Sequence, residues 1–78
     1  RGVCQAASRI AVLHMNIPNM IGQITAILAA QGVNISDMTN KSRDKYAYTL
    51  LDLEHKPEET TVEKLKAIEG VLRVRVVK

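Results

Sequence analysis

Two kinds of hydrophobic periodicity take turns along this chain, and their order constrains the fold more than any other feature. Four stretches alternate side chains in the two-residue pattern of half-buried strands: residues 9–15, 33–40, 45–54 and 71–77. Apolar residues recur at helical spacing from Met20 to Leu28, after the first stretch, and at Val62, Leu65 and Ile68, before the last one. The predicted order is therefore strand, helix, strand, strand, helix, strand.

Residues at the ends of the first helical stripe support its boundaries. Pro18 favours a first helical turn, and the side chain of Asn16 or Asn19 can cap its free N–H groups. Gly32 follows the stripe and predicts its C-terminal end. The loop between the first strand and this helix is thus short and polar.

The second half of the chain carries similar signals. The polar run 40–44 predicts the turn of a hairpin, Thr60 and Glu63 match a capping box, and Gly70 ends the second helix. The whole order predicts a ferredoxin-like βαββαβ fold of the α+β class. Right-handed connections then give a four-stranded antiparallel sheet with two helices on one face.

The length allows a single domain with an aliphatic core. The chain has 78 residues, 46% of them hydrophobic, and neither Phe nor Trp. A core of this size supplies no more than roughly 3–5 kcal/mol, so we expect a partner surface or a larger parent protein. Residues 1–8 are small and aperiodic and are interpreted as a linker, a processed end or a remnant of cloning, which leaves 9–78 as the domain.

Cysteine use and charge indicate the surroundings of the domain. Cys4 is the one cysteine and cannot close an internal disulfide, and no apolar stretch approaches a membrane span, so we expect a cytoplasmic protein that does not contact membranes. The formal net charge is +3, but acidic and basic residues are interspersed. This pattern is typical of a solvated surface and argues against a nucleic-acid partner.

No group of residues in the sequence predicts catalysis. His14, His55 and Cys4 lack metal-ligand spacing, the glycines are too scattered for a phosphate loop, and the serines have no evident base partner. We therefore expect a domain without enzymatic activity, metal or cofactor.

Polar groups converge where the first strand, a loop and the first helix meet. Helix N-terminal amides attract a carboxylate, the side-chain oxygen of Asn16 can accept a hydrogen bond from an ammonium group, and His14 can bond a hydroxyl. Gly22 leaves room for a ligand, and Asn34 opens the second strand. These features predict a pocket for a zwitterion, although caps, helix packing and a turn explain the same residues. The predicted ligand-binding residues are His14, Asn16, Pro18, Asn19, Met20, Ile21, Gly22, Asn34 and Ile35.

Two short motifs carry a resemblance to a known family. His14-Met15-Asn16-Ile17-Pro18 lies at the first strand–helix junction, and Gly32-Val33-Asn34-Ile35 opens the second strand. Both motifs, at this separation, resemble the ACT domain, a βαββαβ module of amino-acid metabolism. The similarity is greatest to the C-terminal regulatory domain of D-3-phosphoglycerate dehydrogenase, an NAD-dependent enzyme.

The resemblance implies a regulatory role for the domain. His14 and Asn16 would bind L-serine, or another small amino acid, while Asn34 reaches in from a second copy. The homodimer would form through strand one and helix one, in an eight-stranded sheet, and would give feedback control of serine biosynthesis by the parent catalytic domain. Asn19 stands where many ACT domains have Gly.

Other functions share this fold. A dimerisation module without a ligand is one alternative, and an RNA-binding domain is another, since Tyr46 and Tyr48 fall on one face of the third strand. The first strand lacks the second set of aromatic residues that such a domain would use. A small acylphosphatase would need an Arg in its first loop, which this chain lacks.

Overall fold

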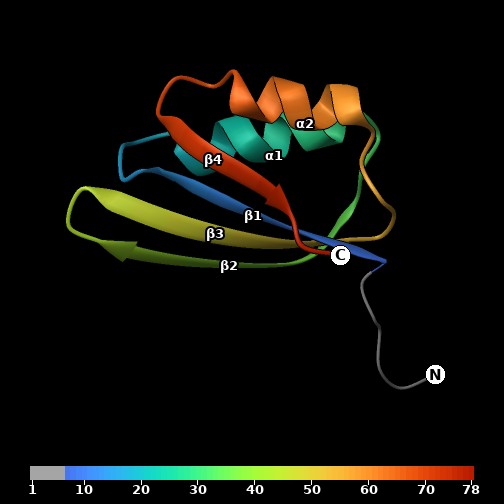
Figure 1. The fold of residues 1–78 in the computed structure, drawn as a ribbon, viewed down its shortest axis with the longest axis horizontal. Helices are drawn as coiled ribbons and strands as arrows, with labels where there is room; N and C mark the ends of the chain where they lie inside the picture. The colour runs from blue at the N-terminus through green and yellow to red at the C-terminus, as the bar shows by residue number, and fades with distance from the viewer. Residues whose placement is uncertain (1–6) are drawn as a thin grey trace.

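The computed structural model describes residues 7–78 and contains the predicted order of elements. The elements are β1 (Ser8–Met15), α1 (Met20–Ala30), β2 (Ile35–Arg43), β3 (Tyr46–Leu53), α2 (Glu59–Lys66) and β4 (Val71–Val76). The fold class predicted from the sequence is confirmed (Figure 1). Cys4 and most of the predicted linker lie outside the described residues.

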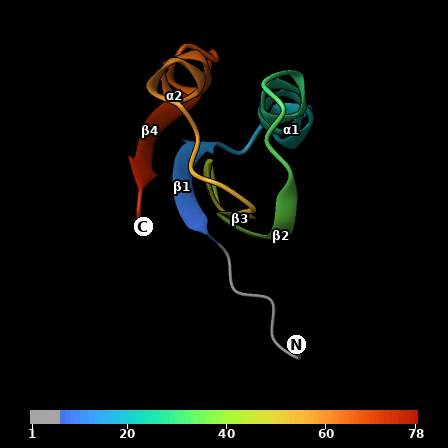
Figure 2. The same cartoon turned by 90° about the vertical axis from the view of Figure 1, so that its right-hand side faces the viewer.

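The four strands form one antiparallel sheet in the order β2-β3-β1-β4. Both helices cover the same face, and the opposite face carries no helix (Figure 2). β1 is therefore an interior strand, bonded to β3 along one edge and to β4 along the other. The eight-stranded sheet that we expected to form through strand one is therefore wrong, because the backbone of β1 is already paired on both sides.

β2 begins and ends later than the sequence predicted, for a different reason at each end. The N–H of Val33 donates to the Leu28 carbonyl (2.8 Å) and that of Gly32, with φ of 76°, to Ala29 (3.0 Å), which closes α1 in a Schellman motif. At the other end, Asp44 adopts φ of 57°, so a tight turn suffices. Residues 41–43, predicted to lie in the turn, therefore continue the strand.

The predicted helix caps are wrong in detail. Asn19 precedes α1 in the left-handed conformation, with φ of 67°, and its side chain makes no cap hydrogen bond. α2 starts at Glu59, after Glu58, which also makes no cap bond, so Thr60 lies inside the helix and no capping box forms. Asn suits position 19, since Gly and Asn are the residues that tolerate the left-handed conformation best.

The core is aliphatic, as predicted, and lies between the sheet and the helices. It includes side chains from all four strands or their flanks and from both helices: Ile10, Val12, Met20, Ile24, Leu28, Val33, Leu51, Leu53, Leu65, Ile68 and Val74. Ser8, which the sequence analysis assigned to the linker, belongs to β1. Its buried hydroxyl donates to the carbonyl of Lys78 (2.6 Å), so it ties the first strand to the C-terminal end of the chain.

Candidate ligand-binding site

His14 is buried near the C-terminal end of β1, on the face covered by the helices, with 1% of its surface exposed. Its Nδ1 lies 2.8 Å from the carbonyl oxygen of Met15, and its Nε2 lies 2.8 Å from the Thr49 hydroxyl. Because the carbonyl can only accept, the geometry assigns the proton of the neutral ring to Nδ1. The Thr49 hydroxyl then donates to Nε2 and accepts from the Asn40 amide (2.8 Å). Both ring nitrogens are thus occupied within the chain.

The loop from Asn16 to Asn19 is exposed and is fixed by its backbone. The N–H of Met15 donates to the Gly70 carbonyl (2.7 Å), and the N–H of Asn16 donates to the Lys45 carbonyl (2.7 Å). The Asn16 side-chain amide donates to the carbonyl of Asp44 (3.3 Å). This side chain leans toward the β2–β3 turn, and its carbonyl oxygen remains available to a ligand.

Gly22 lies in the first turn of α1, directly beside the loop. A Cβ at this position would come within 2.7 Å of Asn19 Oδ1, so the bare backbone makes room for the Asn19 side chain. Since Asn19 makes no cap bond, the first N–H groups of α1 are not satisfied by that side chain. Pro18, Asn19 and Gly22 therefore form an exposed corner with unused backbone donors.

Two of the predicted site residues serve the core instead. Met20 is almost fully buried, and Ile35 is partly buried and packs against the core cluster. Ile21 is partly exposed on α1. Met20 is buried because it belongs to the apolar stripe of α1. Its position next to the loop therefore gives no reason to assign it to ligand binding.

Asn34 lies at the opposite end of the sheet from the other predicted polar residues. Ile35 pairs with Leu53, which pairs with Ser8, whereas Asn16 follows the last residue of β1. The length of β1 separates these ends by about 24 Å. Asn34 donates its side-chain amide to Glu54 Oε1 (3.3 Å). Within one chain the structure therefore does not bring Asn34 beside Asn16.

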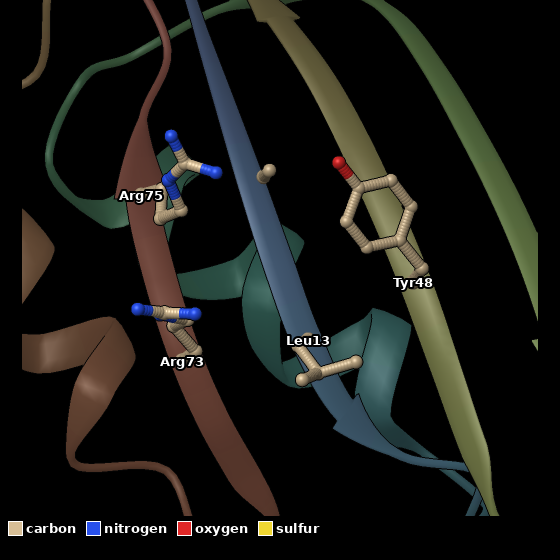
Figure 3. A pocket seen from close by; sticks show the side chains of 5 residues that line it. Leu13, Tyr48, Arg73 and Arg75 are labelled. Atoms are coloured by element: carbon tan, nitrogen blue, oxygen red, sulfur yellow. The ribbon is translucent and has the colours of Figure 1, made fainter.

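The structure contains two hollows that the sequence did not predict. A hollow of about 130 Å³ opens on the helix-free face of the sheet, lined by Ala11, Leu13, Tyr48, Arg73 and Arg75 (Figure 3). The signal was present, because Arg73 and Arg75 alternate with the inward-facing Val74. A second, more polar hollow lies between α2 and the β4 edge, with Pro57, Val62 and Val74 among its lining residues. Neither contains a predicted site residue.

One bidentate ion pair marks the other end of the helix-free face. Arg9 Nε and a terminal nitrogen of Arg9 donate to the two Asp52 carboxylate oxygens, at 2.5 and 3.2 Å. The hydrogen bond from Arg9 lowers the pKa of Asp52 below its usual value, although partial desolvation opposes this shift. The same hydrogen bond raises the pKa of Arg9.

Within residues 7–78, no cluster of three or more His, Cys, Asp or Glu side chains is arranged to hold a metal ion. Neither helix in this range has the length and apolar character that crossing a membrane requires.

These observations define the class of the domain: a ferredoxin-like βαββαβ sheet with an exposed corner between β1 and α1 and one helix-free face. Solved structures with this fold include the ACT domain from GTP pyrophosphokinase of Chlorobium tepidum. Its crystal structure has a TM-score of 0.75 and 22% identity, over 90% of this chain and 95% of that chain. The solution structure of the same domain has a TM-score of 0.71 at 22% identity, over 90% and 83%.

A third similar structure is GqqA, described as a novel type of quorum-quenching acylase. It has a TM-score of 0.72 and 17% identity, and the match covers 90% of this chain but 27% of that chain. No protein-family model and no curated protein sequence matches this chain. The likeness at these identities confirms that the chain has the fold of an ACT domain.

Proposed function

We propose that this domain binds a small amino acid, with L-serine as the first candidate, between two copies of the chain and thereby regulates an attached enzyme. The observation that carries the proposal is the position of Asn34. It lies at the far end of its own sheet from Asn16, while β2, the strand that it precedes, is a free edge. A site that uses both residues therefore needs a second copy.

β2 is suited to pairing with another β2. It is nine residues long, and every residue after Ile35 is exposed. A long exposed edge offers unpaired backbone groups to another strand. Two such strands paired antiparallel about Thr39 bring residue 34 of one copy opposite residue 44 of the other. Because Asn16 bonds the carbonyl of Asp44, this pairing places the partner subunit's Asn34 beside Asn16.

The exposed corner has the chemistry that a zwitterion needs. The first N–H groups of α1, beside Gly22, suit a carboxylate, and the side-chain carbonyl of Asn16 suits an ammonium group. The partner subunit's Asn34 supplies an amide for a hydroxyl or a carboxylate. Since both nitrogens of His14 are occupied, we assign it the role of holding the end of β1, and direct contact would require it to give up Thr49 or Met15.

The regulatory part of the proposal rests on the two sequence motifs and on the fold. A ligand that bridges two copies favours one relative arrangement of the parent enzyme's domains, because it binds that arrangement more tightly. A coupling of about 1–3 kcal/mol changes activity roughly 5- to 150-fold. The motifs favour an NAD-dependent phosphoglycerate dehydrogenase as the parent and feedback by serine as the outcome.

The first experiment is isothermal titration of the domain with L-serine, with D-serine, L-alanine and L-phenylalanine as comparators. We expect saturable heat with L-serine and none with L-phenylalanine. Saturable heat with another small amino acid would support the amino-acid-binding role but would replace serine biosynthesis as the regulated pathway. A dimer, verified by sedimentation, that gives no heat with any of them would support a dimerisation module without a ligand.

A mixing experiment tests whether the site is shared between copies. Asn16→Ala and Asn34→Ala should each abolish binding in their own homodimers. In a mixed dimer, one site loses both residues and the other keeps both. Random mixing should thus restore about a quarter of the wild-type sites, since half of the dimers are mixed and each has one intact site. No recovery, with subunit exchange verified, would exclude the shared site.

A further inference from the structure

The helix-free face of the sheet is arranged in rows that the strand register defines. One row consists of Lys41, Tyr48, Leu13 and Arg73, in the order β2, β3, β1 and β4. The adjacent row toward the β2–β3 turn contains Arg43, Tyr46 and Met15, and the row on the other side contains Thr39, Leu50, Ala11 and Arg75. An aromatic and aliphatic strip on β3 and β1 therefore runs between cations on both edge strands.

The aromatic residues of this strip are open to solvent. Tyr46 is 50% exposed and Tyr48 44% exposed, and both project from β3 on the same face. As residues two apart on a strand, their Cα atoms lie about 6.7 Å apart, which makes two separate stacking surfaces. Figure 3 shows the hollow between the Tyr48 ring and the guanidinium groups of Arg73 and Arg75.

The cations around the strip are not neutralised within the described part of the chain. Its ion pairs are Arg9–Asp52 and Lys66–Glu63, and neither involves the cations of the three rows. The acidic side chains of this face, Asp37 and Asp52, share a row at the far end with Arg9. The half of the face near the β2–β3 turn is therefore positive and aromatic.

From this arrangement we infer that the helix-free face binds single-stranded RNA. Bases present flat π surfaces that stack on Tyr46 and Tyr48, and the guanidinium groups of Arg73 and Arg75 can stack or bind phosphate oxygens in pairs. Four-stranded sheets that carry exposed aromatics recognise unpaired bases in this way. A second copy of this face is a poor occupant, because it would bring two positive surfaces together. This site lies on the opposite side of the sheet from the proposed amino-acid site, so it goes beyond that function.

The test is fluorescence anisotropy of the 78-residue chain with a labelled, unstructured RNA of about 12 alternating A and C nucleotides. We expect saturable binding that weakens roughly 50-fold between about 50 and 200 mM salt if four cations contact phosphates. Tyr48→Leu removes the aromatic surface but keeps an apolar side chain, and should weaken binding by about 5- to 150-fold. Tyr48→Phe keeps the ring and should bind within about 2-fold of wild type.

Two double variants that remove the same charge distinguish RNA binding by this face from general electrostatic attraction between the domain and RNA. Combined Arg73→Ala and Arg75→Ala should weaken binding at least tenfold at low salt and lower the salt slope by about 1.4. Combined Lys56→Ala and Lys64→Ala removes the same charge near α2 and should change binding less than about 2-fold. Circular dichroism verifies that each variant is folded.

Several outcomes would overturn the inference. The first is the absence of saturable binding at low salt, and the second is an equal loss of RNA affinity in both double variants. The others are competition by polyglutamate as effective as that by unlabelled RNA, and a mononucleotide that binds as tightly as the RNA. Since the amino-acid site uses Asn16 and Asn34, serine binding can fail while RNA binding persists, and the reverse.

Discussion

Replacement of Thr49 by Val should destabilise the domain by breaking the buried network around His14. Val has nearly the shape of Thr, so the change removes a hydroxyl without opening a cavity. Thr49 is fully buried, and its hydroxyl is the partner of His14 Nε2 and of the Asn40 amide. Asn40 is exposed and can turn to water, whereas His14 cannot.

The cost follows from the group that is left behind. A buried acceptor without a partner costs about 1–3 kcal/mol, so we expect a loss of about 2 kcal/mol in the free energy of unfolding. For a domain of this size, that loss lowers Tm by roughly 8–16 °C. Combining Thr49→Val with His14→Leu removes both partners and should recover part of the loss, with a coupling of at least about 1 kcal/mol.

Urea denaturation followed by circular dichroism, at one protein concentration, measures these values. The matched control is Thr60→Val, because Thr60 is exposed, and it should change stability by less than about 0.5 kcal/mol. A loss for Thr49→Val no larger than that of the control would refute the reasoning. It would mean that the ring of His14 has another partner in solution.

Three further predictions concern single residues. Asp52→Asn should lower the urea midpoint near pH 7 but not near pH 2, because Arg9 lowers the pKa of Asp52 in the folded state. The stabilisation by this pair is present above the unfolded pKa of about 3.9 and is lost as the pH falls through the lower pKa of the folded state. Equal losses at both pH values would contradict this prediction. Gly70→Ala should cost about 1–3 kcal/mol in thermal unfolding, since Gly70 has φ of 99° and a Cβ there would lie 3.2 Å from Ile17 Cδ1. Asn19→Gly should leave Tm unchanged or raise it, whereas Asn19→Ala should cost about 1 kcal/mol, because position 19 is left-handed; equal Tm values for the two variants would argue against that conformation.

Local signals account for the elements that the sequence predicted correctly. Gly32 has positive φ and follows the end of α1, as expected, whereas α2 ends earlier than predicted, at Lys66, and Gly70 lies beyond its C-cap, Ala67. The capping predictions failed because each depended on the orientation of one side chain. Asn19 adopts the left-handed backbone conformation, and its side-chain oxygen does not cap α1. The end of β2 was missed because Asp44 allowed a tight turn and left the polar residues before it in the strand.

The candidate site was predicted only in its local part. Asn16, Asn19 and Gly22 are close in sequence, and Asn19 lies beside Gly22 in the structure, so the motif pointed to the exposed corner between β1 and α1. The side-chain partner of His14 is Thr49 on β3, and Thr49 in turn accepts from Asn40 on β2, at sequence separations that no local pattern covers. The position of Asn34 depends on the direction in which α1 returns the chain to the sheet.

The order of elements, the aliphatic core and the C-terminal end of α1 were predictable from the sequence, because periodicity and glycine conformation are properties of neighbouring residues. Strand order and register were not, since they join residues that are distant in sequence. They made β1 an interior strand, left β2 as the open edge, and aligned Lys41, Tyr48, Leu13 and Arg73 in one row. Both proposed binding surfaces follow from that alignment, because hydrogen-bonded strands place side chains from different segments on a common face.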